Sequence, residues 1–455
     1  MKKFFILAAF ALSATFAYSQ AKYVFLFIGD GMGFGAVTLT EDYLAACDAK
    51  KTGSGTLTFS TFPVTGFATT YSASSFITCS AASGTALACG SKTRNGRIGM
   101  NEEATANFTS IACRLKENGY KVGISTSVSI DHATPAAFYA HQPSRNMHYE
   151  IAQDLAESGF DFFSGAGLLN PQGKDGKQEN VFDRIAKNGY TVVRSLSECQ
   201  TSTAPKLLLL QPENKPPKAY PYAIDRESDD YTLAQTTSIA IEKLQNSKGF
   251  FLMVEGGKID WASHSNDAGC MVREMVDMSD AVKVALDFYH KHPRQTLIVI
   301  TADHETGGLN VGTSAGSRRD IAGLERQKAS EEKLNRLLAE SISYSTLKNW
   351  LVDNMGITIG YSDEIALRSL LAANVKDTPA NDDDPFTLKK ADPVAKDIMR
   401  MVSAKSNGRY STFDHTGTMV PVYAIGEGSE LFSGKIDNTD IPRKIAKAAK
   451  VKWVE

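Results

Sequence analysis

Polar side chains of the kinds that bind metal ions follow several apolar segments of this chain. Asp30, Glu255 and Asp303 each come directly after an apolar run typical of a buried strand. A fourth such run, 121–126, leads to His132 and Thr134. Because the carboxyl ends of parallel strands meet at one edge of a sheet, we expect these side chains to share one site.

The spacing of two carboxylate and histidine pairs suits metal ions. Asp260 and His264 are four residues apart, so one helical turn places both on the same face, where they can bind one ion. Asp303 and His304 can supply an oxygen and a nitrogen to a second ion, and Zn²⁺ accepts both ligand types. A single Asp-His pair is more often a helix cap or a surface pair. The metal-site interpretation therefore depends on the recurrence of such polar clusters at the ends of several strands. Other side chains offer only oxygen, which suits Mg²⁺: Asp30, Thr134 and Glu255.

Ser80 is the candidate nucleophile. It begins a run of small residues, 80–88, that can form a helix packed closely against a sheet. At the N-terminus of that helix, free N–H groups and the helix dipole favour a phosphate group. An ordinary N-cap serine is the alternative. Cys79 is compatible with a sulfatase, but the Pro and Arg of the sulfatase motif C-x-P-x-R are missing, which excludes that class.

A second motif, residues 31–36, fits the dinucleotide-binding pattern G-x-G-x-x-A after a strand. Asp48 lies near the usual acidic position, but no clear strand carries it. The motif also explains none of the later clusters, so a nicotinamide or flavin enzyme is a distant alternative.

The elements that position these residues alternate between strand and helix patterns. Buried-strand patterns occur at 23–28, 121–126, 160–163, 250–254, 296–301 and 420–425. Helical patterns occur at 111–118, 151–158, 232–244 and 273–290. This alternation predicts an α/β fold with a central, mainly parallel sheet sandwiched by helices. The charged and mostly helical segment 314–407 is interpreted as an insertion on that fold.

The N-terminus resembles a secretory signal peptide. Lys2 and Lys3 precede the apolar run 4–16 and the small residues around Ser19. We expect cleavage after Ser19, which leaves 20–455 as the catalytic domain of an exported protein, periplasmic or secreted. The apolar run is too short to span a bilayer comfortably, so no membrane span is expected.

Charge balance and cysteine spacing bear on which partners and which metal ligands to expect. The 455 residues include 49 Lys and Arg against 51 Asp and Glu, a balance that gives no reason to expect nucleic acid as a specific partner. Export would permit disulfides among the six cysteines, but their spacing does not reveal any pairing. Because no C-x-x-C motif is present, a metal ion would be held by histidines and carboxylates.

Taken together, these residues resemble the alkaline phosphatase family. Six motifs occur in order: GDGMG at 29–33, SAASGTA at 80–86, HATPA at 132–136, VEGGKID at 254–260 with His264, TADH at 301–304 and HTG at 415–417. The resemblance extends from 24 to about 426 and is least certain in the expected insertion.

The resemblance implies hydrolysis of small phosphate monoesters through a phosphoserine at Ser80, with two Zn²⁺ ions and one Mg²⁺ ion. It implies three ligand sets: Asp260, His264 and His415 for the first zinc; Asp30, Asp303 and His304 for the second; and Asp30, Thr134 and Glu255 for magnesium. It also implies that Arg145 clamps the phosphate, with a solvated charge at a helix start as the alternative. Relatives are often homodimers, so the resemblance leaves a homodimer open, although nothing in the sequence itself shows self-association.

Three positions depart from the family pattern. Cys79 stands where relatives often carry an aspartate that steadies the arginine, so we expect a looser Arg145 and weaker retention of phosphate. His132 and Trp261 differ from some relatives, and we expect them to lie by the substrate and to tune metal affinity and pH optimum. A packed histidine and an ordinary buried aromatic are the alternatives. The rival functions are a phosphodiesterase or phosphonate hydrolase of the same superfamily and, more distantly, a noncatalytic metal-binding protein.

Overall fold

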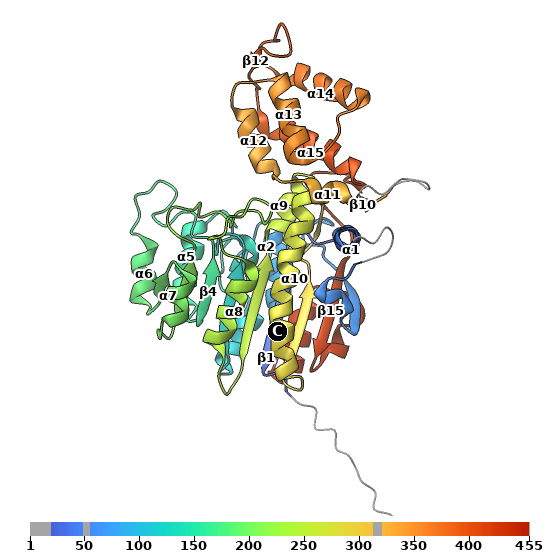
Figure 1. The fold of residues 1–455 in the computed structure, drawn as a ribbon. Coiled ribbons are helices and arrows are strands. Elements are labelled where there is room, and N and C mark those ends of the chain that lie inside the picture. The colour runs from blue at the N-terminus through green and yellow to red at the C-terminus, as the bar shows by residue number, and fades with distance from the viewer. Residues whose placement is uncertain (1–19, 49–54, 313–320, 455) are drawn as a thin grey trace, which may run out of the picture.

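The computed structural model describes residues 20–48, 55–312 and 321–454 (Figure 1). The expected signal peptide and the first residues of the expected insertion lie outside the described residues. All six cysteines are described, and each carries a free thiol. Within the described ranges, no helix combines the length and the apolar character needed to cross a bilayer.

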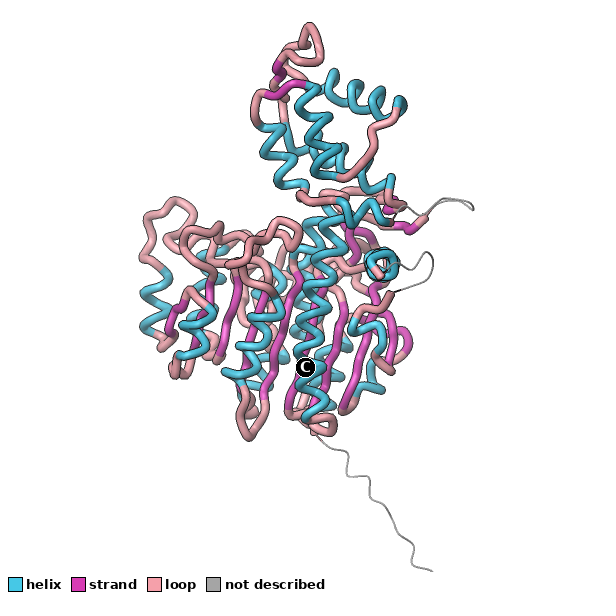
Figure 2. Tube along the Cα trace, in the orientation of Figure 1, coloured by secondary structure: helices cyan, strands magenta, loops and turns pink. Residues whose placement is uncertain are grey.

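A ten-stranded sheet forms the centre of the molecule (Figures 1 and 2). Its spatial order is β16-β2-β15-β8-β1-β7-β3-β4-β6-β5, and only β15 runs against its neighbours. The strands are β1 Tyr23–Gly29, β2 Val64–Thr69, β3 Lys121–Thr126, β4 Phe162–Gly165, β5 Thr191–Val193, β6 Leu207–Leu210, β7 Phe250–Gly256, β8 Thr296–Thr301, β15 Val420–Gly426 and β16 Gly434–Asp437. The predicted α/β class with a mainly parallel sheet is confirmed.

Helices flank this sheet on both sides (Figure 2). They are α1 Phe34–Cys47, α2 Ser80–Cys89, α3 Ile111–Glu117, α4 Ala133–Ala136, α5 His148–Glu157, α6 Val181–Lys187, α7 Leu196–Thr201, α8 Leu233–Leu244, α9 Lys258–His264, α10 Ala268–Lys291 and α16 Asp440–Ala448. Helix α10 contacts β1, β7 and β8 and lies beside α8, while α2, α3 and α16 contact one another.

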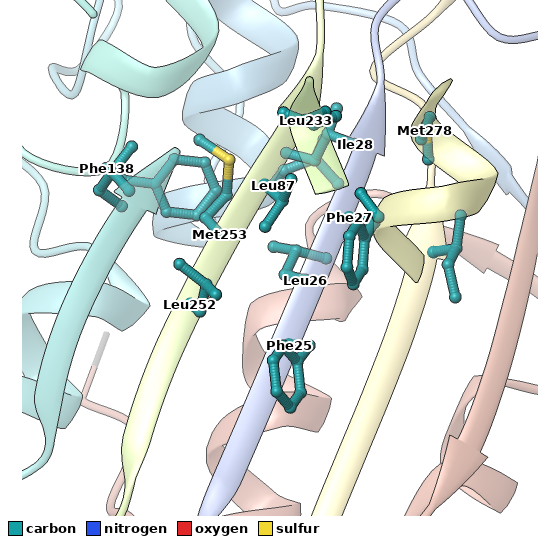
Figure 3. Packing of buried hydrophobic residues seen from close by; sticks show 14 of the residues in the cluster. Phe25, Leu26, Phe27, Ile28, Leu87, Phe138, Leu233, Leu252, Met253 and Met278 are labelled. Atoms are coloured by element: carbon teal, nitrogen blue, oxygen red, sulfur yellow. The ribbon is translucent and has the colours of Figure 1, made fainter. Parts of the chain in front are cut away.

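The central strand β1 shows why the apolar runs are continuous. Phe25, Leu26, Phe27 and Ile28 are all 0% exposed, because β1 is covered on both faces (Figure 3). The ring of Phe25 packs against Phe288 of α10 at 5.8 Å between centroids. Strand β1 pairs with β7 on one side and β8 on the other, in parallel register, so the ends of these three strands meet.

A second hydrophobic cluster lies above one end of the sheet (Figure 1). It is built mainly by α12 Glu331–Ala339, α13 Tyr344–Met355, α14 Tyr361–Asn374 and α15 Ala391–Lys405, which follow α11 Ala322–Arg326. Short strands complete the chain: β9 Glu305–Thr306, β10 Asn310–Val311, β11 Ile342–Ser343, β12 Pro385–Phe386, β13 Gly408–Arg409 and β14 His415–Thr416.

Candidate metal centre and nucleophile

The carboxyl ends of adjacent strands carry the polar clusters identified in the sequence. Asp30 directly follows β1, Glu255 lies near the end of β7, and Asp303 follows β8 by one residue. His415 reaches the same place from far along the chain, because β14 pairs with β9 and sets His415 opposite Thr306. The fold therefore gathers these side chains at one edge of the sheet.

Two histidines and one carboxylate form the first donor group. The side chains of Asp260 and His264 share one face of α9, with Oδ1 of Asp260 3.4 Å from Nε2 of His264. Nδ1 of His264 contacts the carbonyl oxygen of Phe413, and Nδ1 of His415 lies 2.9 Å from that of Thr78. A carbonyl oxygen only accepts, so each Nδ1 carries a hydrogen, and each Nε2 is the ring nitrogen left to bind a cation.

These two Nε2 atoms are 3.1 Å apart, and Nε2 of His415 is 3.6 Å from Oδ1 of Asp260. Both nitrogens thus face the same small space beside the Asp260 carboxylate, where one cation could bind all three atoms. Two imidazole nitrogens and one carboxylate are a donor set typical of Zn²⁺.

The second donor group is fully buried and adjoins the first. Nε2 of His304 lies 3.2 Å from Oδ2 of Asp303 and 3.5 Å from Oδ1 of Asp30. Neither of these carboxylate oxygens has a hydrogen-bond partner among the described residues, although both are buried. The rings of His304 and His415 stack at 3.5 Å between centroids, so the two groups share a border. Buried, unpartnered anionic oxygens fit a site for a divalent cation.

The protonation equilibria show the same excess of negative charge. Burial, and then the charge of Asp260, raises the pKa of Asp303 to about 8. Burial, and then the charge of Asp303, raises the pKa of Asp30 well above its usual value. Burial, and then the neighbouring histidines, lowers the pKa of His304 well below its usual value. A divalent cation among these groups would favour the ionised carboxylates and the neutral imidazole.

A third donor group lies on the other side of Asp30. Oγ1 of Thr134 is 3.5 Å from Oδ2 of Asp30, and Thr126 donates a hydrogen bond to Oε2 of Glu255. Oε1 of Glu255 and Nδ1 of His132 are 4.0 Å apart and buried, and the part of the chain that the structure describes offers neither a hydrogen-bond partner. Burial raises the pKa of Glu255 to about 7. His132, expected only to tune such a site, thus adds a nitrogen donor to an otherwise oxygen-rich group.

Ser80 lies at the border of the first two donor groups. It is the first residue of α2, is 2% exposed, and holds its Oγ 3.3 Å from Nε2 of His304. The first N–H groups of a helix have no partner within that helix, so the start of α2 can bind an anion. Gly84 lets α2 approach α4 closely, since a Cβ there would lie 3.2 Å from that of Ala137.

Arg145 and Trp261 lie near the third donor group. Nη2 of Arg145 is 3.0 Å from Nε2 of His132, and its backbone N–H donates to the carbonyl of Gly96 at 2.7 Å. Gly96 also donates a hydrogen bond of 3.1 Å to Sγ of Cys79. Among the described residues, Arg145 forms no ion pair. The expectation that its side chain is held less firmly than in relatives with an aspartate at the position of Cys79 stays a prediction. The ring of Trp261 meets that of His132 edge-on at 6.0 Å.

The structure adds Thr306, which sequence reasoning missed. Its hydroxyl donates to Oδ1 of Asp260 at 2.5 Å and lies 3.2 Å from Nδ1 of His304. It thereby connects the first donor group with the second. A single threonine near a strand end has no distinctive spacing, so nothing in the sequence singled it out.

Comparison with known proteins decides the family. Residues 21–164 and 160–451 match the family described as Alkaline phosphatase. This chain belongs to the alkaline phosphatase family. Alkaline phosphatase 3 of Bacillus subtilis is 32% identical over 439 residues, which cover 94% of this chain and 89% of that protein.

Solved alkaline phosphatases share the fold. The cold-active enzyme of Shewanella sp. is 29% identical with a TM-score of 0.78, over 94% of this chain and 99% of that one. The enzyme of Thermus thermophilus is 26% identical, also with a TM-score of 0.78, over 99% of this chain and 96% of that one. The enzyme of the Antarctic bacterium TAB5 is 27% identical with a TM-score of 0.66, over 96% of this chain and 100% of that one.

Proposed function

We propose that this alkaline phosphatase family member hydrolyses phosphate monoesters through a phosphoserine formed on Ser80, with two Zn²⁺ ions and one Mg²⁺ ion as cofactors. One observation carries the proposal: the Ser80 hydroxyl, at the N-terminus of α2, lies 3.3 Å from His304 within a cluster of buried metal-type donors.

The donor groups fit the cofactors that the family implies. The first zinc would be held by Asp260, His264 and His415; the second by Asp30, Asp303 and His304; and magnesium by Asp30, Thr134 and Glu255. When bound, the cations supply the positive charge that stabilises a deprotonated nucleophile and a departing alkoxide. A variant of the TAB5 alkaline phosphatase in which a histidine is replaced by glutamate has been solved with Mg bound in a site called M3, which supports magnesium binding by carboxylates in the family.

The residues of the chain bind and orient the ester. The first-turn N–H groups of α2 and the guanidinium of Arg145 would hold the non-bridging phosphate oxygens. One Nη of Arg145 is used by His132, which leaves other donors for phosphate. Ser80 Oγ then forms a bond to phosphorus as the ester P–O bond breaks. Water next attacks the phosphoserine, which releases inorganic phosphate and restores the hydroxyl.

Substrate preference distinguishes the proposed monoesterase from its rival of the same superfamily, a phosphodiesterase or phosphonate hydrolase. A diester needs room for a second substituent and lacks one of the phosphate charges that Arg145 would bind. Turnover of 4-nitrophenyl phosphate should therefore exceed that of its methyl diester, and chelation should abolish it. A higher rate with the diester would favour the rival.

The variant Ser80→Ala tests the alternative that this protein binds metal ions without catalysis. This variant should lose turnover yet retain zinc by elemental analysis, because Ser80 is not among the proposed ligands. Ser164→Ala is the matched control, since Ser164 is equally buried, lies on β4 and makes only a 3.4 Å contact with Tyr220. Full turnover by Ser80→Ala would overturn the proposal.

Export and self-association belong to the same proposal. We expect residues 1–19 to be absent from the mature protein and the protein to be periplasmic or secreted. We also expect a homodimer. N-terminal sequencing of the secreted protein and sedimentation analysis would measure both.

A further inference from the structure

A cavity of about 380 Å³ adjoins the donor groups, with Trp261 in its wall. Trp261 directly follows Asp260 on α9, and its ring lies 6.0 Å from that of His132. The other walls come from the loop that contains Lys218 and from α12. Helix α12, which Figure 1 shows above the sheet, therefore contributes to the wall of this cavity.

The charged groups that line this cavity are unevenly paired. Every lining carboxylate has a lysine within 4.0 Å: Asp225 with Lys333 at 3.2 Å, Asp230 with Lys215 at 2.8 Å, Glu227 with Lys215 at 3.7 Å, and Glu332 with Lys258 at 3.9 Å. These contacts occupy three of the lining lysines and all four lining carboxylates, and Lys215 also lies 3.6 Å from Asp229. Two lining cations, Lys218 and Arg336, remain.

Neither remaining cation has a carboxylate partner among the residues that the structure describes. Nζ of Lys218 lies 4.7 Å from the centre of the Trp261 ring, an uncharged partner. Nε of Arg336 donates to the backbone carbonyl of Glu332 at 3.3 Å, which is also uncharged. Both side chains are exposed at the cavity, so both can bind an incoming anion.

We propose that this cavity receives the alcohol portion of the substrate and favours phosphate monoesters whose alcohol carries a second anionic group, a phosphate or a carboxylate. This inference rests on the proposed function, which fixes the reacting phosphate at Ser80. Trp261 connects the two regions, because it follows the proposed metal ligand Asp260 on α9 and also lines the cavity. Lys218 and Arg336 then bind the distal anion, while Trp261 packs against the apolar part of the alcohol.

The test compares kcat/KM for three series of esters of increasing chain length. Neutral alkanediol monophosphates are the reference, ω-phosphooxyalkanoates supply a distal carboxylate, and alkanediol bisphosphates, corrected for their two equivalent ends, supply a distal phosphate. At the best chain length, we expect the anionic esters to exceed the neutral ones by about fivefold, the effect of two partly exposed ion pairs. The two anionic series show which distal group is preferred.

The double variant Lys218→Gln with Arg336→Gln should bring this ratio close to one. Lys435→Gln is the matched control, because it removes an exposed positive charge from β16 at the edge of the sheet and should leave the ratio unchanged. Equal kcat/KM for neutral and anionic esters at every length, or a ratio that survives the double variant, would overturn the inference and leave the proposed function standing. Failure to hydrolyse any of the esters would instead overturn the proposed function.

Discussion

Replacing Thr306 by valine should weaken two of the proposed metal sites at once. The hydroxyl of Thr306 donates to Oδ1 of Asp260 and lies within hydrogen-bond reach of Nδ1 of His304. Valine has nearly the same shape but no hydroxyl, so Asp260 loses a donor and the buried imidazole N–H loses an acceptor. Both ligands would then be free to turn away from the cations.

The magnitude follows from these two contacts. A hydrogen bond to a charged group contributes about 1.5–3 kcal/mol, and an unsatisfied buried polar group costs about 1–3 kcal/mol. Partners that orient metal ligands typically change metal affinity by about 10- to 100-fold when removed. We therefore expect Thr306→Val to lower zinc affinity by about that factor.

The assay is a competition between the protein and a zinc chelator of known affinity, followed by elemental analysis. Thr237→Val is the matched control, because Thr237 is 0% exposed on α8 and its hydroxyl has no hydrogen-bond partner. The control should retain zinc as the wild type does. If Thr306→Val retained zinc equally well, Thr306 would not orient the ligands and this reasoning would be refuted.

Three further predictions concern the same region. Gly31→Ala should reduce metal retention, because φ is +76° there and a Cβ would lie 2.8 Å from the backbone of α9. Gly159→Ala is the control: φ is +68° there as well, but open space surrounds the position, so metal retention should not change. Chelated protein should melt at progressively lower temperature from about pH 5 to 7, because folded Asp303, with a pKa of about 8, is protonated there while the unfolded chain has lost that proton. The free energy of unfolding then falls by about 1.4 kcal/mol per pH unit, and a flat or rising melting temperature would contradict this. Cys79→Asp should strengthen inhibition by phosphate up to about fivefold by pairing with Arg145, and unchanged or weaker inhibition would count against that pairing.

The central strands could be predicted from the sequence, because burial on both faces leaves an unbroken apolar signal. β1, β3 and β8 lie where their apolar runs indicated, and the α/β class followed from their alternation with helices. β2 and β16 were missed, since half-exposed strands that contain Gly, Thr, Lys or Asp lack that signal. β6 was missed although it is buried, because four leucines close to prolines form a very short run.

For the site, the sequence supplied residue types and the fold supplied their orientation. The spacing of Asp260 and His264 predicted a shared helical face, which α9 provides. The backbone carbonyls that orient His264 and His415 could not be predicted, because any residue has one. The cavity beside Trp261 was equally hidden, since its walls come from separate segments of the chain.

The most direct test is crystallography of the zinc-loaded protein with anomalous data collected at the zinc edge. Two peaks are expected, one among Asp260, His264 and His415 and one among Asp30, Asp303 and His304, each about 2.0–2.2 Å from its ligand atoms. The second peak should adjoin the hydroxyl of Ser80. Catalytically active crystals with no peak at these positions, or with zinc bound only elsewhere, would contradict the account.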